Sequence, residues 1–137
     1  VNAKELEMIV ASVAMQVTPT YKLKSYVINS SNLIAPTAQI ELEKDGEVLQ
    51  GIQIGDGPID AAFLAIEQIT GCHYDLDDFQ IQSITEGSEA IGSALVKLRA
   101  NDKLFSGNGI STDIIGASIR AYINAINKIV YEENQNN

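Results

Sequence analysis

The sequence predicts an α+β domain made of two units related by pseudo-twofold symmetry, each folded as three strands and then a helix, with helices packed on sheets. Three observations carry this prediction. A shift of 56 residues, which lays residue 92 on residue 36, brings two halves of the chain into register. Each half alternates apolar and polar positions, as half-buried strands do, ahead of a segment with helical spacing. A length of 137 residues and a hydrophobic share of 45% are enough for one domain with its own core.

The repeat is weak in identity but consistent in its turns and apolar positions. The matched positions, first unit before second, are Pro36–Leu42 with Gly92–Leu98, Asp45-Gly46 with Asn101-Asp102, Gly51 with Gly107, Ile59 with Ile115, and Ala65 with Ala121. Agreement over this length without a gap indicates a duplicated unit.

Three strands are predicted in the first unit. Tyr21–Asn29 is rich in β-forming residues. Ala38–Leu42 alternates apolar and polar side chains, Asp45-Gly46 is a strong hairpin signal, and Val48–Ile54 is the return strand.

A helix closes this unit. The sequence Gly55-Asp56-Gly57 turns the chain, Pro58 suits the first helical position, and Gly71 supplies the stop. The apolar residues between them recur at helical spacing: Ile59, Ala62, Phe63, Ile66 and Ile69.

The second unit repeats this order. Strands are predicted at Phe79–Ile84, Ala94–Leu98 and Leu104-Phe105. Ser111 is the expected helix cap, and Asp113 is favourably placed against the helix dipole. The apolar stripe of this helix is Ile115, Ile119, Tyr122, Ile126 and Ile129.

Residues 1–18 belong to neither unit. Asn2 and Glu5 form a capping box ahead of an amphipathic segment, which we interpret as a helix from the tail of a preceding segment. The expected domain covers residues 19–131, divided into unit one (19–74) and unit two (75–131), and residues 132–137 are expected to fray.

The charge is concentrated in one stretch. The net charge is −9, and twelve carboxylates lie between Glu41 and Glu89 against one cation, Lys44. A nucleic-acid partner needs a cluster of Lys and Arg that this chain lacks, and the same charge disfavours anionic membranes. Since no apolar run approaches the length of a membrane span, we expect a cytoplasmic protein.

Few residues offer reactive chemistry. Cys72 and His73 are the single cysteine and the single histidine, adjacent in the sequence and without an obvious third partner, so a surface loop pair is the favoured interpretation over a small enzyme. Asp75–Asp78 lacks the features of an EF-hand loop and is interpreted as a solvated loop. Gly55–Gly57 and Gly107–Gly109 are interpreted as tight turns between a strand and a helix, without the third glycine of a dinucleotide fingerprint.

These turns also have a narrower functional interpretation. Free N–H groups at a helix N-terminus donate hydrogen bonds to a carboxylate, while Asp56, Asp60 and Asp113 would pair with an ammonium group. A wall formed by Ile59, Ala62 and Ile66 would accept a branched side chain. A small aliphatic amino acid matches this set of groups.

Several motifs carry a family resemblance over Tyr21 to Val130. Gly-Asp-Gly-Pro-Ile-Asp-Ala at 55–61, the segment 107–115 and the segment 121–127 resemble the C-terminal regulatory domain of 2-isopropylmalate synthase. Tyr21-Lys22-Leu23 and Thr85-Glu86-Gly87 are similar to that family too. The resemblance implies a dimeric allosteric module that binds leucine near the dimer interface, between its units. Leucine lowers the activity of a distant catalytic barrel, which condenses acetyl-CoA with 2-oxoisovalerate.

The resemblance also implies an effector site. Its positions fall on the residues Gly55, Asp56, Gly57, Ile59, Ala62, Ile66, Gly109, Thr112 and Ile114. At Ala62 many relatives have a larger, often aromatic residue, so the pocket or its effector differs here. The barrel's metal-binding residues have no counterpart, so no cofactor and no catalytic residue is expected in this fragment.

The sequence leaves three functions open: a leucine-binding domain, an isoleucine-binding domain, and a dimerisation module without effector binding. The expected partners are L-leucine, a second copy of the chain and the missing catalytic barrel. L-isoleucine is the alternative effector, as in the related domain of citramalate synthase, because apolar pockets separate such isomers by only about 1–3 kcal/mol. A dimerisation module that has lost its sensor is the third possibility.

Overall fold

The computed structural model describes residues 19–33, 35–86 and 89–135. Within these ranges, the side chains of residues 84–86 and 89–90 are not described. The predicted helix at Asn2–Val17 lies outside the described residues. The elements are β1 (Lys22–Asn29), β2 (Thr37–Lys44), β3 (Glu47–Ile54), α2 (Pro58–Thr70), β4 (Asp75–Glu86), β5 (Glu89–Ala100), β6 (Lys103–Ser111) and α3 (Ile114–Gln135).

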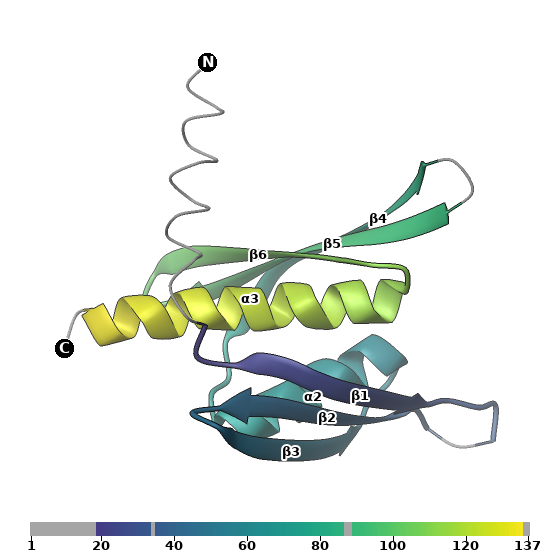
Figure 1. The fold of residues 1–137 in the computed structure, drawn as a ribbon, viewed down its shortest axis with the longest axis horizontal. Helices are drawn as coiled ribbons and strands as arrows, with labels where there is room; N and C mark the ends of the chain where they lie inside the picture. Colours follow the sequence, from purple (N-terminus) through teal and green to yellow (C-terminus); the bar gives the residue numbers. More distant parts are fainter. Residues whose placement is uncertain (1–18, 34, 87–88, 136–137) are drawn as a thin grey trace.

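The predicted α+β fold of two strand–strand–strand–helix units is confirmed. Each unit forms an antiparallel three-stranded sheet, in the orders β1-β2-β3 and β4-β5-β6. In Figure 1 the sheet of unit two lies at the top and that of unit one at the bottom, with α3 running between them. Inward-facing residues of the central strands, including Ile40, Leu42, Val96 and Leu98, join both helices in one buried core. None of the helices in the described part of the chain is long and apolar enough to cross a membrane.

The duplication extends to irregularities of the sheets. A β-bulge interrupts β1 just after Leu23, which pairs with Leu42 of β2. The same irregularity follows Leu76 of β4, which pairs with Leu98 of β5. The first strands match at a shift of 53 residues rather than 56, because β4 and β5 continue as a hairpin for four further pairs, Ser83↔Gly92 to Glu86↔Glu89.

Both β2–β3 and β5–β6 hairpins use two residues with positive φ. Asp45 and Gly46 have φ of 53° and 82°, and Asn101 and Asp102 have φ of 54° and 62°. Two consecutive positive φ values are the geometry of a type I′ turn, whose twist matches that of the flanking strands. The hairpin predicted from Asp45-Gly46 is thus confirmed, and its repeat uses the same turn without a glycine.

Each helix approaches its own sheet closely through a glycine. A Cβ at Gly51 of β3 would lie 2.6 Å from the carbonyl oxygen of Ala65 in α2. At the equivalent position of unit two, a Cβ at Gly107 would lie 2.2 Å from the carbonyl oxygen of Ala121 in α3. Small residues at both contacts let the helix backbone rest directly on the strand, which fixes the height of each helix above its sheet.

Two boundaries differ from the sequence prediction. Asp75–Asp78, expected as a solvated loop, forms the start of β4, because Asp77 bonds Arg99 at 3.1 Å and Asp78 lies opposite Lys97. Residues 132–135, expected to fray, continue α3 to Gln135, where the Glu132 carboxylate pairs with the ammonium group of Lys103. The predicted helix start at Pro58 and the stop at Gly71, with φ of 73°, are confirmed.

Candidate functional site

The strand–helix junctions of the two units lie at one end of the molecule. In Figure 1 both helices begin toward the right of the view, where β3 and β6 finish. This arrangement follows from the pseudo-twofold relation of the units. The sequence-predicted residues at these junctions, Gly55–Gly57 and Thr112 to Ile114, therefore gather at the same end.

The junction of unit one requires glycine at one position only. A Cβ at Gly55 would lie 2.4 Å from the backbone nitrogen of Ala61, so the turn folds back against the first turn of α2. Gly57 is the N-cap residue in extended conformation, and a Cβ there would meet nothing within 4 Å. The Asp60 carboxylate accepts a hydrogen bond from the backbone N–H of Asp56 at 3.0 Å.

No side chain caps the N-terminus of α2. Pro58 has no N–H, and the backbone N–H of Ala61 already donates to the carbonyl of Gly57 at 2.9 Å. The N–H groups of Ile59 and Asp60 belong to the first turn of α2, and N–H groups of a first turn have no acceptor within the helix. This is the arrangement that favours a carboxylate.

The junction of unit two is occupied by the protein itself. The Asp113 carboxylate accepts hydrogen bonds from the backbone N–H groups of Ile115 and Gly116 at 3.1 and 3.2 Å. The Tyr26 hydroxyl of β1 donates to the same carboxylate at 3.1 Å. Asp113 is therefore the cap of α3, and its charge is already used within the fold.

Ser111 is not the helix cap that the sequence predicted. It ends β6, and its hydroxyl accepts a hydrogen bond from the backbone N–H of Asp113 at 3.3 Å. The strand continues far enough to move the cap two residues on. An aspartate at this position is as good an N-cap as serine, so local preference alone does not distinguish them.

Gly107 and Gly109 lie within β6 rather than in a turn, which corrects the sequence interpretation. A Cβ at Gly109 would lie 2.1 Å from the carbonyl oxygen of Ala117 in α3. These glycines are required by the close contact between β6 and α3. The turn of unit two is formed by Thr112 and Asp113 instead.

The apolar residues predicted for the site divide into two groups. Ala62 and Ile66 are 0% exposed and belong to the core of the protomer. Ile59 is partly buried against the core, Ile114 is 39% exposed beside Gly92, and Thr112 is exposed. The accessible part of the predicted site is thus the turn, Ile59 and the start of α3.

An aromatic contact that the sequence analysis missed joins the two helices. The rings of Phe63 and Tyr122 stack at a centroid distance of 4.2 Å, and Phe79 of β4 meets Phe63 edge-on at 5.6 Å. The Tyr122 hydroxyl donates to Glu67 at 3.1 Å. Burial, followed by the charge of Glu67, raises the pKa of Tyr122. Both Phe63 and Tyr122 lie in the predicted apolar stripes of their helices, but stripe spacing does not identify a partner.

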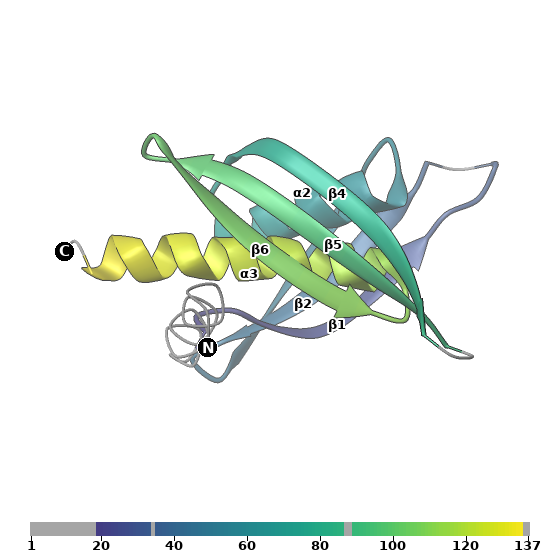
Figure 2. The ribbon, with the colours of Figure 1, turned by 90° about the horizontal axis from the view of Figure 1, so that it is seen from above.

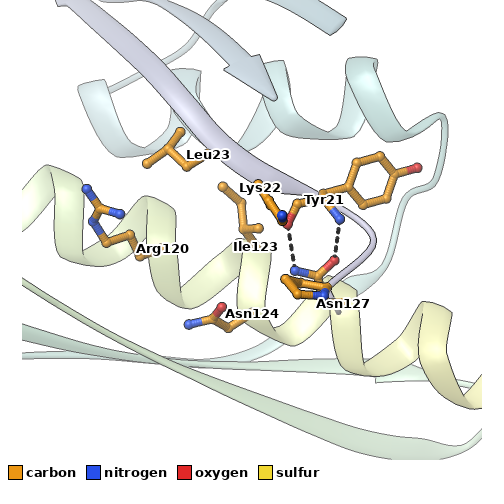
Figure 3. Close-up of a pocket in the computed structure, with 8 residues that line it drawn as sticks. Tyr21, Lys22, Leu23, Arg120, Ile123, Asn124 and Asn127 are labelled. Carbon is orange, nitrogen blue, oxygen red and sulfur yellow. Dashed lines mark hydrogen bonds between the residues drawn. The ribbon is translucent and has the colours of Figure 1, made fainter. Parts of the chain in front are cut away.

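A shallow pocket lies away from these junctions, between β1 and α3 (Figure 3). It has a volume of about 200 Å³ and is lined by Pro19, Tyr21, Lys22, Leu23, Arg120, Ile123, Asn124 and Asn127. At its edge the Asn127 amide accepts from the backbone N–H of Tyr21 at 2.8 Å and donates to the carbonyl of the same residue at 2.9 Å. This pair of bonds ties the start of unit one to the helix of unit two.

The Cys72-His73 pair forms no catalytic arrangement in the described structure. Both residues are exposed, and the Nδ1 of His73 lies 2.9 Å from a carboxylate oxygen of Glu67. Burial, followed by a hydrogen bond with Cys72, raises the pKa of Tyr74. The pair thus contacts groups of the α2–β4 connection, in agreement with the loop interpretation.

Comparison with known proteins supplies the family. Residues 1–130 match the family model described as the LeuA allosteric (dimerisation) domain. The chain is 40% identical over 132 residues to a 2-isopropylmalate synthase of Ruminiclostridium cellulolyticum and 39% identical over 132 residues to that of Clostridium kluyveri, each match covering 96% of the chain. A 2-isopropylmalate synthase of Heliobacterium modesticaldum is 41% identical over 112 residues, or 82% of the chain.

The chain covers only part of each of these relatives. It spans about a quarter of the relatives' length, 26% for the first two and 22% for the third. A solution structure of both dsRBDs of DRB4 matches with a TM-score of 0.30 at 13% identity, covering 96% of this chain and 94% of that one. The chain belongs to the LeuA allosteric (dimerisation) domain family, the regulatory dimerisation domain of 2-isopropylmalate synthases.

Proposed function

We propose that this chain is the effector-binding part of a cytoplasmic 2-isopropylmalate synthase, that it dimerises, and that it binds L-leucine for feedback inhibition. The rest of that protein would be a metal-dependent barrel that condenses acetyl-CoA with 2-oxoisovalerate. The chain alone would carry no catalysis. The match of the family model over residues 1–130, together with the relatives' printed names, supports this proposal.

The observation that carries the ligand proposal is the uncapped N-terminus of α2. Leucine's carboxylate would accept hydrogen bonds from the N–H groups of Ile59 and Asp60, and the exposed Asp56 would pair with its ammonium group. The isobutyl group would lie against the accessible part of Ile59. The start of α3, with Thr112 and Ile114, would close the site from the second unit.

Only one of the two junctions suits such a ligand. Asp113 already fills the N-terminus of α3, and a second carboxylate there would meet its charge. We therefore propose one effector site per protomer, at the unit-one junction. Inhibition further requires that leucine bind two conformations of the whole protein with different affinity, typically by 1–3 kcal/mol.

A dimerisation module without a sensor is the second candidate. The full burial of Ala62 and Ile66 favours it, because neither side chain is open to a ligand in the protomer. Isoleucine is the alternative effector, and it differs from leucine only in the position of one methyl group.

Calorimetric titration of the chain with leucine, isoleucine and glycine at one protein concentration tests the proposal. We expect leucine to bind most tightly and glycine not at all. Tighter binding of isoleucine would reassign the effector. Absence of heat with any of them, at several temperatures, would leave the dimerisation module.

Two substitutions localise the site. Ile59→Asp should abolish binding because it places a second carboxylate where the isobutyl group would lie. Ile110→Asp is the matched control, since Ile110 is 65% exposed on β6 and outside the proposed site. Circular dichroism must show both variants folded. Equal loss of binding in the two variants would contradict the placement.

A further inference from the structure

Among the described residues, side chains bond the backbone of two of the four edge strands, β3 and β6, and the repeat relates these bonds. On β3, the backbone N–H of Ile52 donates to the side-chain oxygen of Gln68 at 3.1 Å. At the equivalent place in unit two, the Asn124 amide of α3 donates to the carbonyl of Asn108 on β6 at 2.6 Å. Lys128 donates to the next available carbonyl of β6, that of Ser106, at 2.6 Å.

The edge strand β1 is held only just ahead of its first residue. The Asn127 amide bonds both backbone groups of Tyr21, immediately before the strand (Figure 3). The repeat offers no counterpart for β4, because the position equivalent to Asn127 is Gly71, where α2 has already ended. Between Asp75 and Ser83, no side chain of the described residues hydrogen-bonds the backbone of β4. Figure 2 shows β4 along the outer margin of its sheet.

This open edge is long and uncharged at its centre. The strand has 12 residues, and the run Phe79–Thr85 contains no charged residue, proline or glycine. The carboxylates Asp77 and Asp78, ahead of that run, face Arg99 and Lys97 of β5. A neutral edge strand with unpaired backbone groups recruits another strand, which proteins normally prevent by charge or proline.

The inward face of β4 is open as well. Leu76 and Ile81 pair with the buried Leu98 and Ala94, yet they are 46% and 42% exposed. Their exposure follows from the position of α3, which packs mainly on β6 and β5. A partner strand at this edge would therefore satisfy the backbone groups and cover apolar side chains at the same time.

We propose that a second copy of this chain pairs with β4, antiparallel across a twofold axis, so that two three-stranded sheets become one of six strands. A twofold interface must be self-complementary, and an antiparallel edge pairing meets that condition. With the axis near Ile81, the Ile81 side chains of the two copies face each other. Asp75, Asp77 and Asp78 then lie far from those of the other copy. The proposal rests on the dimerisation proposed above and assigns its surface.

Hydrogen–deuterium exchange tests the surface in the unmodified chain. We expect amides within residues 79–83 to gain protection as the protein concentration rises through the dimerisation transition measured by sedimentation. Amides of β6, which forms the opposite edge of the same sheet, should not change. If sedimentation shows a dimer but the protection of the β4 amides does not change with protein concentration, the proposed β4 interface is wrong and the dimerisation proposal stands. A monomer at every concentration would overturn both.

Substitution gives an independent result. Ile81→Lys places two ammonium groups opposite each other at the axis and should weaken the dimer about fivefold. Ile110→Lys, the exposed control on β6, should leave the dissociation constant unchanged. Circular dichroism verifies that both variants are folded. Equal dissociation constants for the two variants would overturn the proposal, whereas loss of the dimer in Ile81→Lys alone would support it.

Discussion

The ring of Phe63 in α2 stacks on the ring of Tyr122 in α3, with 4.2 Å between centroids and 25° between the planes. One turn beyond Phe63, Glu67 accepts the hydrogen bond of the Tyr122 hydroxyl. Two residues of unit one thus hold both the face and the polar end of one side chain from unit two. This contact fixes how the helices cross between the sheets, and it distinguishes the two units, since Ile66 occupies the repeat position of Tyr122.

Loss of the Tyr122 hydroxyl should destabilise the fold. Tyr122→Phe keeps the ring stacking and removes a bond to a carboxylate, at a cost of about 1.5–3 kcal/mol in the free energy of unfolding. Urea unfolding measures it. Tyr131→Phe is the control, because Tyr131 is 42% exposed on the same helix and should change stability little. Equal stabilities of the two variants would contradict the importance of the bond.

Stability should also fall at alkaline pH. Burial is the largest cause that raises the pKa of Tyr122 above the ordinary value of 10.0, and it raises the pKa values of Tyr26 and Tyr74 in the same way. Above about pH 10 the unfolded chain loses tyrosine protons that the folded chain retains, so the free energy of unfolding decreases as pH rises. Urea unfolding across this range should show a shallower decrease for Tyr122→Phe. An identical slope in that variant would refute the assignment.

Alanine should destabilise the fold far more at Gly107, where β6 contacts α3, than at Gly57, which faces open space. Gly107→Ala forces a Cβ against the carbonyl oxygen of Ala121 and should cost about 1–3 kcal/mol or more. Gly57→Ala meets open space in extended backbone and should stay within about 0.5 kcal/mol of the parent. Thermal unfolding compares the two. A tolerated Gly107→Ala would show that α3 is free to move away from β6.

The two type I′ turns predict opposite effects of reciprocal substitutions. Asp102 holds φ of 62°, so Asp102→Gly should stabilise the β5–β6 hairpin by about 0.5–1 kcal/mol. In unit one, Gly46→Asp creates the same strain at φ of 82° and should destabilise by a similar amount. Calorimetric melting of both variants provides the measurement, and changes of the same sign would contradict the turn assignment.

The Asp113 cap of α3 should contribute to the stability of the fold. Asp113→Ala leaves two N–H groups and the Tyr26 hydroxyl without their acceptor and should cost about 1–2 kcal/mol. Ser111→Ala removes a single weaker bond at 3.3 Å and should cost less. The midpoints of guanidinium unfolding separate the two. A larger loss in Ser111→Ala would restore serine as the cap.

Local signals in the sequence determined much of the fold. Alternation defined β2, the Asp45-Gly46 pair defined its hairpin, and Pro58 and Gly71 marked the ends of α2. The 56-residue repeat predicted the second unit from the first. These features are predictable because turn conformation and side-chain period depend on neighbours in the chain.

The tertiary structure alone decided the rest. Asp77 joins a strand because Arg99 approaches from β5, and Gly107 lies within a strand because α3 presses on it. Ala62 and Ile66 have the spacing of a ligand wall, yet packing between the sheets buries them completely. In each case the deciding partner is distant in sequence, so no local pattern carries its position. Periodicity states which face of an element is apolar, and only the fold states what covers that face.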